Sequence, residues 1–439
     1  MDKKILIDEL LALGVEVSDP NNDEHTTRKH DDPFIVQKKD TDSRDPFERD
    51  YARVLHSPSF RRLQGKMQLL GTQTNDYYRT RLTHSLEVSQ IGAEIATKVY
   101  ADNDSKIKVS KALVTMACLT HDIGNPPFGH FGEKALNMLM KDHGGFEGNA
   151  QTLRIVCNLE QKSQDYKGLN LTLASRLALV KYNVTAQQKN KEGKLKEGKF
   201  LYDDLTSEIN TKSKLKTQTL ECQIMEISDD IAYACHDLED SLKSGVLTLE
   251  DVIWSLKSKD KSAHSQFTEI LEISKKLCGN SHGDIYLKSI TSVLINTFVN
   301  DIKVIDLNKE EMLKKGTVYS KGLGLKEYKG LLKQLKNVVY DLLVRQPSVA
   351  EYEIKGGIIV RQLFTMLVDE KYNYNNRLFP LEYQKIIENN PEVPTVSLYR
   401  TASDYISEMT DSFAMRLYKK HFGKDMPSYN DCDWNDSIN

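Results

Sequence analysis

No stretch of the 439-residue chain reaches the ~18–20 consecutive apolar residues that a membrane-spanning helix needs. The amino terminus, MDKKILIDELLALGVEV, mixes charges with short apolar runs and lacks the organisation of a secretory signal. The net charge is only −3, so the chain has no global positive excess of the kind that coats nucleic acid. These absences predict a cytoplasmic protein with no membrane partner.

Paired cysteines are also absent. The cysteines are scattered without a CxxC motif, and some lie inside apolar runs such as VTMACL. This pattern is typical of buried free thiols in a reducing compartment, and it argues against a disulfide framework or a cysteine-based zinc site. The six residues are Cys118, Cys157, Cys222, Cys235, Cys278 and Cys432.

A complete phosphate-binding P-loop is missing as well. The segment GKLKEGKF at 193–200 has the spacing G-x-x-x-x-G-K, but Phe200 stands where a P-loop needs Ser or Thr to hold Mg²⁺. An apolar strand does not precede it. We therefore interpret the segment as a Lys-rich surface loop.

What the chain does contain is helical periodicity. Few runs alternate apolar and polar residues, so we predict a mainly α fold. Beyond the core, single amphipathic segments are expected at 249–257, 264–278, 285–300, 327–345, 353–370 and 398–422. The composition changes along the chain divide it into a polar arm, a helical core with a Lys-rich solvated insertion or hairpin, a helical C-terminal region and an acidic tail. Their ranges are 1–46, 47–245 (insertion 186–218), 246–425 and 426–439.

Four chemically versatile residues are concentrated in CLTHDIGNPPFGHFGEKAL, residues 118–136. His121 and Asp122 end an apolar helical pattern, because the following Gly and Pro residues cannot continue a helix. His130 and Glu133 follow at the start of the next helical pattern. A buried core histidine or a surface His-Glu ion pair would explain any one of them, but four together suggest a shared site.

Two further residues of the same types lie on helices elsewhere. His84 shares a face with Val88 and Ile91, and Asp229 shares a face with Tyr233. A hydrogen-bonded core histidine and a polar helix face are the alternatives. A buried carboxylate on a largely apolar helix becomes reasonable if a cation neutralises it. Two imidazoles and two carboxylates form a mixed N/O set suited to Mn²⁺, Fe²⁺, Mg²⁺ or Zn²⁺.

The pattern H…HD…D resembles that of the HD-domain phosphohydrolases, which are named for such a His-Asp pair. The resemblance is closer to their deoxyguanosine-triphosphate triphosphohydrolase (dGTPase) branch. Ordered blocks that look like this branch extend over roughly 45–420. They are DYARVLHSPSFRRLQGKMQLL, YRTRLTHSLEVSQIG, LTHDIGNPPFGHFGEKAL, GGFEGNAQTLRIV, LTLASRLALVKY, EISDDIAYACHDLED and DYISEMTDSFAMRLY.

The resemblance implies an HD-domain helical fold for the core, with additional C-terminal helices that complete the site and form an oligomer interface. It implies that His84, His121, Asp122 and Asp229 bind a divalent metal, with Mg²⁺ or Mn²⁺ expected first and Fe, Ni or Zn also compatible. His130 and Glu133 resemble the catalytic pair of the family. At positions i and i+3 of a helix the two side chains can touch, so that Glu133 can orient His130.

The same resemblance implies substrate contacts. Cationic and hydroxyl side chains would bind the phosphates, because a nucleoside triphosphate carries about four negative charges that need partners. Others would lie near the sugar, with Tyr399 a candidate for excluding a 2′-hydroxyl. The expected phosphate contacts are Arg81, Lys181, Tyr182 and Lys199, and the expected sugar-side contacts are Tyr233, Asp237, Gln68 and Leu69.

The activity implied is hydrolysis of a deoxynucleoside triphosphate, dGTP foremost, to the deoxynucleoside and tripolyphosphate, which controls the dNTP pool. His130 would protonate the leaving 5′-oxygen or position the attacking water. Two alternatives stay open: another HD-type nucleotidase or phosphodiesterase, and a non-catalytic nucleotide-sensing or nucleic-acid-binding protein. Relatives assemble as homo-oligomers, hexamers or tetramers, and a nucleotide or single-stranded DNA effector is compatible with the family. Gly148 and Asp230 depart from residues found in some relatives.

Overall fold

The computed structural model describes most of the chain between residues 44 and 423. Within this part the backbone is mainly helical, which confirms the predicted fold class. The structure describes residues 44–68, 79–100, 109–182, 184–186, 199–209, 218–279, 283–306, 321–344, 346–388 and 394–423, together with Thr26, Arg28, Asn308 and Glu311.

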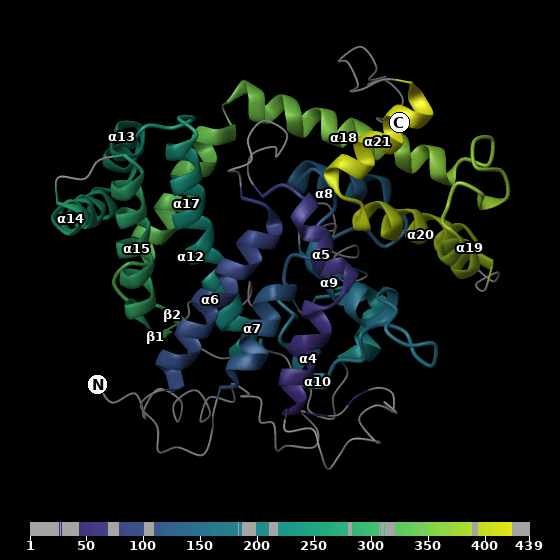
Figure 1. Cartoon of the computed structure of the whole chain (residues 1–439), viewed down its shortest axis with the longest axis horizontal. Helices are drawn as coiled ribbons and strands as arrows, with labels where there is room; N and C mark the ends of the chain where they lie inside the picture. Colours follow the sequence, from purple (N-terminus) through teal and green to yellow (C-terminus); the bar gives the residue numbers. More distant parts are fainter. Residues whose placement is uncertain are drawn as a thin grey trace.

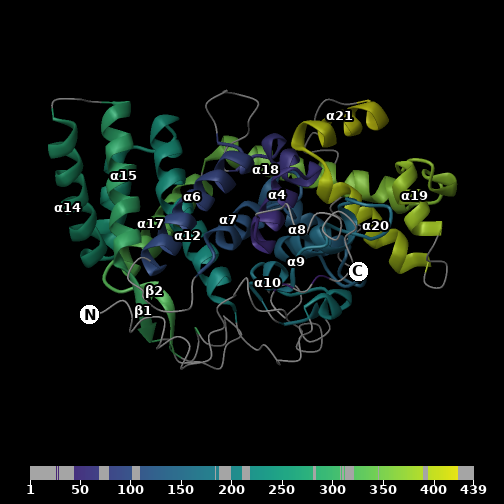
Figure 2. The same cartoon turned by 60° about the horizontal axis from the view of Figure 1, so that its bottom comes forward.

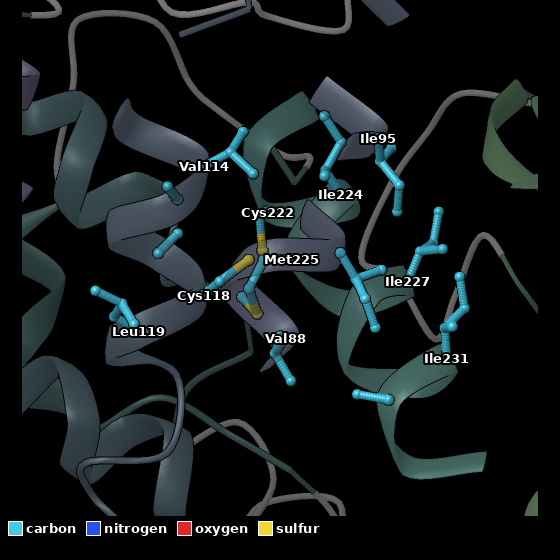
Figure 3. Packing of buried hydrophobic residues seen from close by; sticks show 14 of the residues in the cluster. Val88, Ile95, Val114, Cys118, Leu119, Cys222, Ile224, Met225, Ile227 and Ile231 are labelled. Atoms are coloured by element: carbon cyan, nitrogen blue, oxygen red, sulfur yellow. The ribbon is translucent and has the colours of Figure 1, made fainter. Parts of the chain in front are cut away.

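Three helices form the centre of the molecule. The helix α6 (Arg81–Tyr100) packs against both α7 (Lys111–Thr120) and α12 (Leu220–Lys243). Ser110 caps the amino end of α7, since its side chain accepts a hydrogen bond from the backbone N–H of Leu113. Apolar side chains from all three helices interdigitate between them, including the labelled side chains in Figure 3. This buried contact fixes the three helices relative to one another.

Shorter helices surround this centre and complete the amino-terminal half. They begin with α4, whose first turn is stabilised by a capping box between Asp45 and Glu48. Figure 1 shows α4, α5, α7, α8 and α9 close together in the middle of the molecule. The elements are α4 (Pro46–Leu55), α5 (Pro58–Arg62), η1 (Leu63–Gly65), α8 (Gly129–Leu139), α9 (Gly148–Arg154), the π-helical turn η2 (Ile155–Leu159), α10 (Leu173–Leu177) and η3 (Asp203–Glu208).

The carboxyl-terminal half lies on two sides of this centre. Helices α13 to α15 and α17 gather on one side and α18 to α21 on the other, in both views (Figures 1 and 2). On the second side, α18 packs on α8 around a separate buried apolar cluster. The elements are α13 (Leu249–Lys259), α14 (Lys261–Cys278), α15 (Asp284–Asp301), α17 (Lys329–Val344), α18 (Pro347–Val368), η4 (Tyr374–Asn376), α19 (Leu381–Glu388), α20 (Pro394–Glu408) and α21 (Asp411–Phe422).

The amphipathic segment at 398–422 is two helices, so the prediction of one segment was wrong. Helix α20 ends at Glu408, and Thr410 caps the start of α21 by accepting a hydrogen bond from the backbone N–H of Phe413. The hydrophobic pattern continues across the break because both helices contribute to the same apolar cluster. The break places Asp411 at the beginning of a new helix.

A small antiparallel hairpin interrupts the helices, and the sequence did not predict it. Strand β1 (Ile302–Asp306) pairs with β2 (Lys321–Leu325), with Ile302 opposite Leu325. The backbone N–H of Leu323 also donates to the side-chain oxygen of Gln223 on α12, at 3.0 Å. The hairpin is therefore held against the central helix.

The Lys-rich segment at 186–218 is only partly described, and its described part is not solvated as predicted. Phe200, Tyr202 and Leu205 are buried, and Thr185 forms a parallel bridge with Leu201. Tyr202 shows the reason: its hydroxyl donates to Gln151 of α9 at 3.1 Å, and Arg400 of α20 lies over its ring. The lysines that surround these aromatic residues along the chain gave no sign of such contacts. In the part of the chain that the structure describes, no helix combines the length and apolar character that crossing a membrane requires.

Candidate active site

Four residues of metal-ligand type meet where the three central helices converge. His84 lies in the first turn of α6, His121 is the C-cap of α7, Asp122 follows it, and Asp229 lies on α12. Ligand atoms of His84, His121 and Asp122 all lie within 4.8 Å of one another. Asp229 Oδ1 lies 3.3 Å from His84 Nε2 and 3.4 Å from His121 Nε2. The structure thus brings together all four residues that the sequence singled out.

Both imidazoles turn their Nε2 atoms toward Asp229 Oδ1. His121 Nδ1 lies 2.6 Å from the carbonyl oxygen of Cys118, so that its N–H can donate there and leave the Nε2 lone pair facing the carboxylates. His121 Nε2 is buried and has no hydrogen-bond partner among the described residues. Burial lowers the pKa of His84, which favours the neutral imidazole that can act as a ligand. An orphaned buried nitrogen beside two carboxylates fits a bound cation.

Neighbouring cations and an amide hold the two carboxylates in place. Arg81 Nη1 donates to Asp122 Oδ2 at 2.6 Å, and the side-chain amide of Asn125 donates to Asp122 Oδ1. Lys181 Nζ donates to Asp229 Oδ2 at 3.1 Å. Burial alone would raise the pKa of Asp122, but Arg81 and the imidazoles lower it to about 2. Burial also opposes ionisation of Asp229, yet Lys181 leads the groups that hold its pKa well below the usual range.

A second pair of titratable residues lies at the start of α8. His130 Nδ1 is 3.3 Å from Glu133 Oε2, and the His130 side chain is 54% exposed. Glu133 Oε1 accepts from the backbone N–H of Gly148 and from Lys199 Nζ, both at 3.1 Å. Burial would raise the pKa of Glu133, but the hydrogen bond from His130 and the charge of Lys199 lower it to about 2. Glu133 is therefore an ionised carboxylate that can accept a hydrogen bond from His130 Nδ1 and orient the imidazole.

The predicted substrate residues on α12 form one face beside the metal-ligand cluster. Asp237 is fully buried, and neither carboxylate oxygen has a hydrogen-bond partner within the described ranges. Burial, with help from Asp240, raises the pKa of Asp237 well above its usual value. Burial likewise raises the pKa of Tyr233, and it raises the pKa of Tyr182 to about 12. The two tyrosines are therefore uncharged hydroxyl groups near neutral pH, able to donate as well as accept hydrogen bonds.

Other predicted contacts have different outcomes. Gln68 is described, and its Oε1 is buried without a partner in the described part of the chain. Leu69 lies outside the described residues. Lys199, predicted to contact phosphate, pairs with Glu133 and with Glu147 Oε1 at 3.0 Å. Tyr399 stacks on His143 with ring centroids 3.9 Å apart, in the second apolar cluster.

Three residues that sequence reasoning missed contact the predicted site. Asn125 holds Asp122, Glu147 shares Lys199 with Glu133, and Lys336 of α17 pairs with Asp230. Lys336 Nζ also lies 5.6 Å from the centroid of the Tyr233 ring. Asn125 and Glu147 lie inside the sequence blocks that resemble the dGTPase branch, and that position was a signal for both. Lys336 is one lysine among several on an amphipathic helix, and nothing in its sequence context distinguishes it.

Comparisons with known proteins agree with this arrangement. Residues 81–234 match the HD domain, and residues 326–420 match the phosphohydrolase-associated domain. The chain is 38% identical to deoxyguanosinetriphosphate triphosphohydrolase-like protein 2 of Vibrio cholerae, over 91% of this chain and 93% of that protein. It is 36% identical to the deoxyguanosinetriphosphate triphosphohydrolase-like proteins of Shewanella baltica and Shewanella oneidensis, over 88% of this chain and 94% and 95% of those proteins.

Proposed function

The chain belongs to the HD-domain phosphohydrolases of the dGTPase-like family, and from this membership we propose that it hydrolyses a deoxynucleoside triphosphate, dGTP foremost, to the deoxynucleoside and tripolyphosphate. One observation carries the proposal. The ligand atoms of two histidines and an aspartate converge within 4.8 Å, next to the cationic side chains of Arg81 and Lys181. A site that sets cationic side chains beside a cation-binding cluster suits a polyphosphate.

His84, His121, Asp122 and Asp229 would hold the divalent metal. Two nitrogens and two carboxylate oxygens suit Mg²⁺ or Mn²⁺, and Fe, Ni or Zn are also compatible with this set. When bound there, the metal supplies Lewis acidity to a phosphate oxygen and lowers the pKa of bound water. The chain's own contribution is to keep both aspartates ionised and both imidazoles oriented.

The phosphates would be bound by cations that already surround the cluster. Arg81 and Lys181 each donate to a metal-site carboxylate through one group, and a phosphate oxygen can share the remaining donors. Lys336 adds a cation from the phosphohydrolase-associated domain beside Tyr233. Tyr182 is a neutral hydroxyl donor to the same phosphates. Together these groups offset the roughly four negative charges of a nucleoside triphosphate.

The sugar would lie along the face of α12. Tyr233 and Asp237 follow Asp229 at successive turns, so both are within reach of a nucleotide whose phosphates meet the metal cluster. Asp237 and Gln68 carry buried oxygens that lack partners among the described residues, and a sugar hydroxyl could satisfy them. We expect Leu69 to pack near the deoxyribose.

His130 and Glu133 would supply the acid/base chemistry. Glu133 Oε2 can accept a hydrogen bond from His130 Nδ1–H, which leaves Nε2 as the atom that exchanges a proton with the leaving 5′-oxygen or with the attacking water. Both roles need an ionised Glu133, and its contacts with Gly148 and Lys199 keep it so. The His130–Glu133 pair is therefore suited to catalyse hydrolysis, which a protein that only binds nucleotides would not need.

The test is an assay with Mn²⁺ or Mg²⁺ over all four dNTPs and GTP, in which tripolyphosphate is resolved from pyrophosphate. We expect deoxynucleoside and tripolyphosphate in equal amounts. Pyrophosphate or orthophosphate as the sole inorganic product would instead identify another HD-type hydrolase. In the same assay His130→Ala should lose turnover and keep nucleotide affinity, while His264→Ala on α14 should behave like the wild type. Equal turnover in His130→Ala would contradict the mechanism.

A further inference from the structure

Lys66 is a buried lysine that the proposed chemistry does not use. Its side chain lies just after η1, only 2% of the residue is exposed, and burial lowers its pKa to about 7. The ammonium donates to the backbone carbonyl of Asn125 at 2.5 Å and to that of Ser407 at 2.7 Å. Lys66 thereby joins the segment after the His-Asp pair to the end of α20.

Asp411 makes the complementary contacts. It is the first residue of α21 and is 1% exposed. Its Oδ1 accepts from the backbone N–H of Phe128 at 3.0 Å, and its Oδ2 accepts from that of Met67 at 2.9 Å. The hydroxyl of Tyr352 on α18 lies 3.4 Å from Oδ2. Both carboxylate oxygens therefore bind backbone groups of the amino-terminal half.

These contacts fall on the elbow between α7 and α8, defined here as residues 121–129. The elbow begins with His121 and Asp122 and ends one residue before His130. Phe128 has a left-handed backbone with φ of 61°, a conformation that a side chain other than Gly adopts only at a cost. Lys66 binds the backbone at 125 and Asp411 binds it at 128, so both hold the stretch that spaces the metal ligands from the catalytic pair.

The same contacts reach two other parts of the site. The Asn125 side chain donates to Asp122, so Lys66 holds the residue that orients a metal ligand. Met67, which Asp411 binds through its N–H, directly precedes Gln68. Burying a lysine and an aspartate is costly, and apolar residues of similar volume often stabilise a protein more. The burial of these two groups is explained if they fix a backbone geometry that apolar packing would not hold in one position.

We propose that Lys66 and Asp411 are positioning residues, which fix the elbow so that the metal cluster and the His130–Glu133 pair face one phosphate. Through their contacts the catalytic geometry depends on the phosphohydrolase-associated domain, which contains Ser407 and Asp411. This role rests on the proposed function, because it assigns a purpose to the spacing of two groups that act on one substrate. Neither residue is among the predicted substrate contacts. Their effect acts through Asn125, Phe128 and Met67.

The experiment compares Lys66→Met, Lys66→Arg and Asp411→Asn with the full-length wild type. We expect Lys66→Met and Asp411→Asn to lower kcat for dGTP roughly 10- to 100-fold, since a displacement of about 1 Å can cost 10²-fold, with KM changed less than about threefold. Lys66→Arg keeps a cationic donor and should recover part of the loss. Asp411→Asn keeps the shape of the side chain but loses one acceptor, so it tests the role if Lys66→Met does not fold.

Arg154→Met is the matched control. Arg154 joins α9 to Asp404 of α20 through paired hydrogen bonds at 2.9 and 2.8 Å, so its loss loosens the same domain junction without a contact to the elbow backbone. We expect it to lower the melting temperature and leave kcat within about threefold of the wild type. An equal loss of kcat in Arg154→Met would show that Lys66 and Asp411 act only by stabilising the fold.

Amide hydrogen exchange separates this inference from the proposed function. Lys66→Met and Asp411→Asn should increase exchange across 122–130 more than across α14, whatever the substrate is. If the wild-type protein hydrolyses no dNTP, the proposed function is refuted. The hydrogen-exchange result would still decide whether Lys66 and Asp411 fix the elbow. Unchanged exchange across 122–130, or unchanged kcat in both variants, would overturn the inference.

Discussion

Lys199 Nζ lies 3.1 Å from Glu133 Oε1, although 66 positions separate the two residues. The same ammonium lies 3.0 Å from Glu147 Oε1. Glu147 is buried, and burial raises its pKa. One cation therefore stabilises two carboxylates that would otherwise repel each other beside the predicted catalytic histidine. It reaches them because Phe200 and Tyr202 anchor the adjoining chain in the interior.

Lys199→Met should lower kcat roughly tenfold with KM nearly unchanged. Without the ammonium, Glu147 repels the negative charge of Glu133, and Glu133 becomes a weaker acceptor for the His130 Nδ1 proton. Steady-state kinetics with dGTP separate the two constants, and Lys141→Met, at an exposed residue just after α8, is the control. A raised KM with normal kcat would mean that Lys199 leaves its carboxylates and binds the phosphates.

His121→Ala should weaken Mn²⁺ binding by more than tenfold. The variant removes the orphaned Nε2 and leaves Asp122 and Asp229 without one of the imidazoles between them. Asn125→Leu should also weaken Mn²⁺ binding, because partners that orient a ligand typically contribute 10–100-fold in affinity. Equilibrium dialysis with Mn²⁺ measures both, with His264→Ala as the control. Wild-type affinity in His121→Ala would place the metal elsewhere.

Lys336→Met should raise KM for a nucleoside triphosphate roughly 10- to 100-fold, because losing one charge-assisted contact costs about 1.5–3 kcal/mol. The effect should be larger at low ionic strength, where charges are less screened. Lys333→Met, one turn earlier on the exposed side of α17, is the matched control. If both variants keep the wild-type KM at low salt, Lys336 serves only to pair with Asp230.

The metal cluster could be predicted from the sequence because its residue types are distinctive and its spacings are local. His84 and Asp229 each lie at helical spacing from the apolar residues of their own helix, α6 and α12. His121 and Asp122 mark the end of a third helix, α7. The helices themselves follow from the hydrophobic pattern, since their buried faces create the central core. Helix faces and helix ends were therefore accessible to reasoning from the sequence.

Contacts between distant segments could not be predicted in this way. Lys336 and Asp230 are 106 positions apart, and whether a surface lysine meets an aspartate depends on how α17 packs on α12. The hairpin at 302–325 escaped notice because its strands are short and one contains two glycines. The buried aromatic residues after Lys199 were hidden in a polar stretch. In each case tertiary packing, which a single sequence does not display, decides the outcome.

Lys66 also predicts how stability depends on pH. Burial lowers the pKa of Lys66 from an ordinary 10.5 to about 7. Below pH 7 the lysine is protonated in both the folded and the unfolded chain, and the full cost of burying its charge is present. Between about pH 7 and 10.5 the unfolded chain binds a proton that the folded chain lacks, so the free energy of unfolding contributed by Lys66 rises with pH.

Lys66→Met should remove this rise. The upper bound on the contribution is about 5 kcal/mol, from ~1.4 kcal/mol per pKa unit. Other groups titrate in the same window, so the informative quantity is the difference in melting temperature between wild type and variant at each pH. We expect that difference to change steadily in favour of the wild type from pH 7 to 10, and Lys141→Met to show no such trend. Parallel pH curves for wild type and Lys66→Met would mean that Lys66 keeps an ordinary pKa, with its ammonium accessible to water.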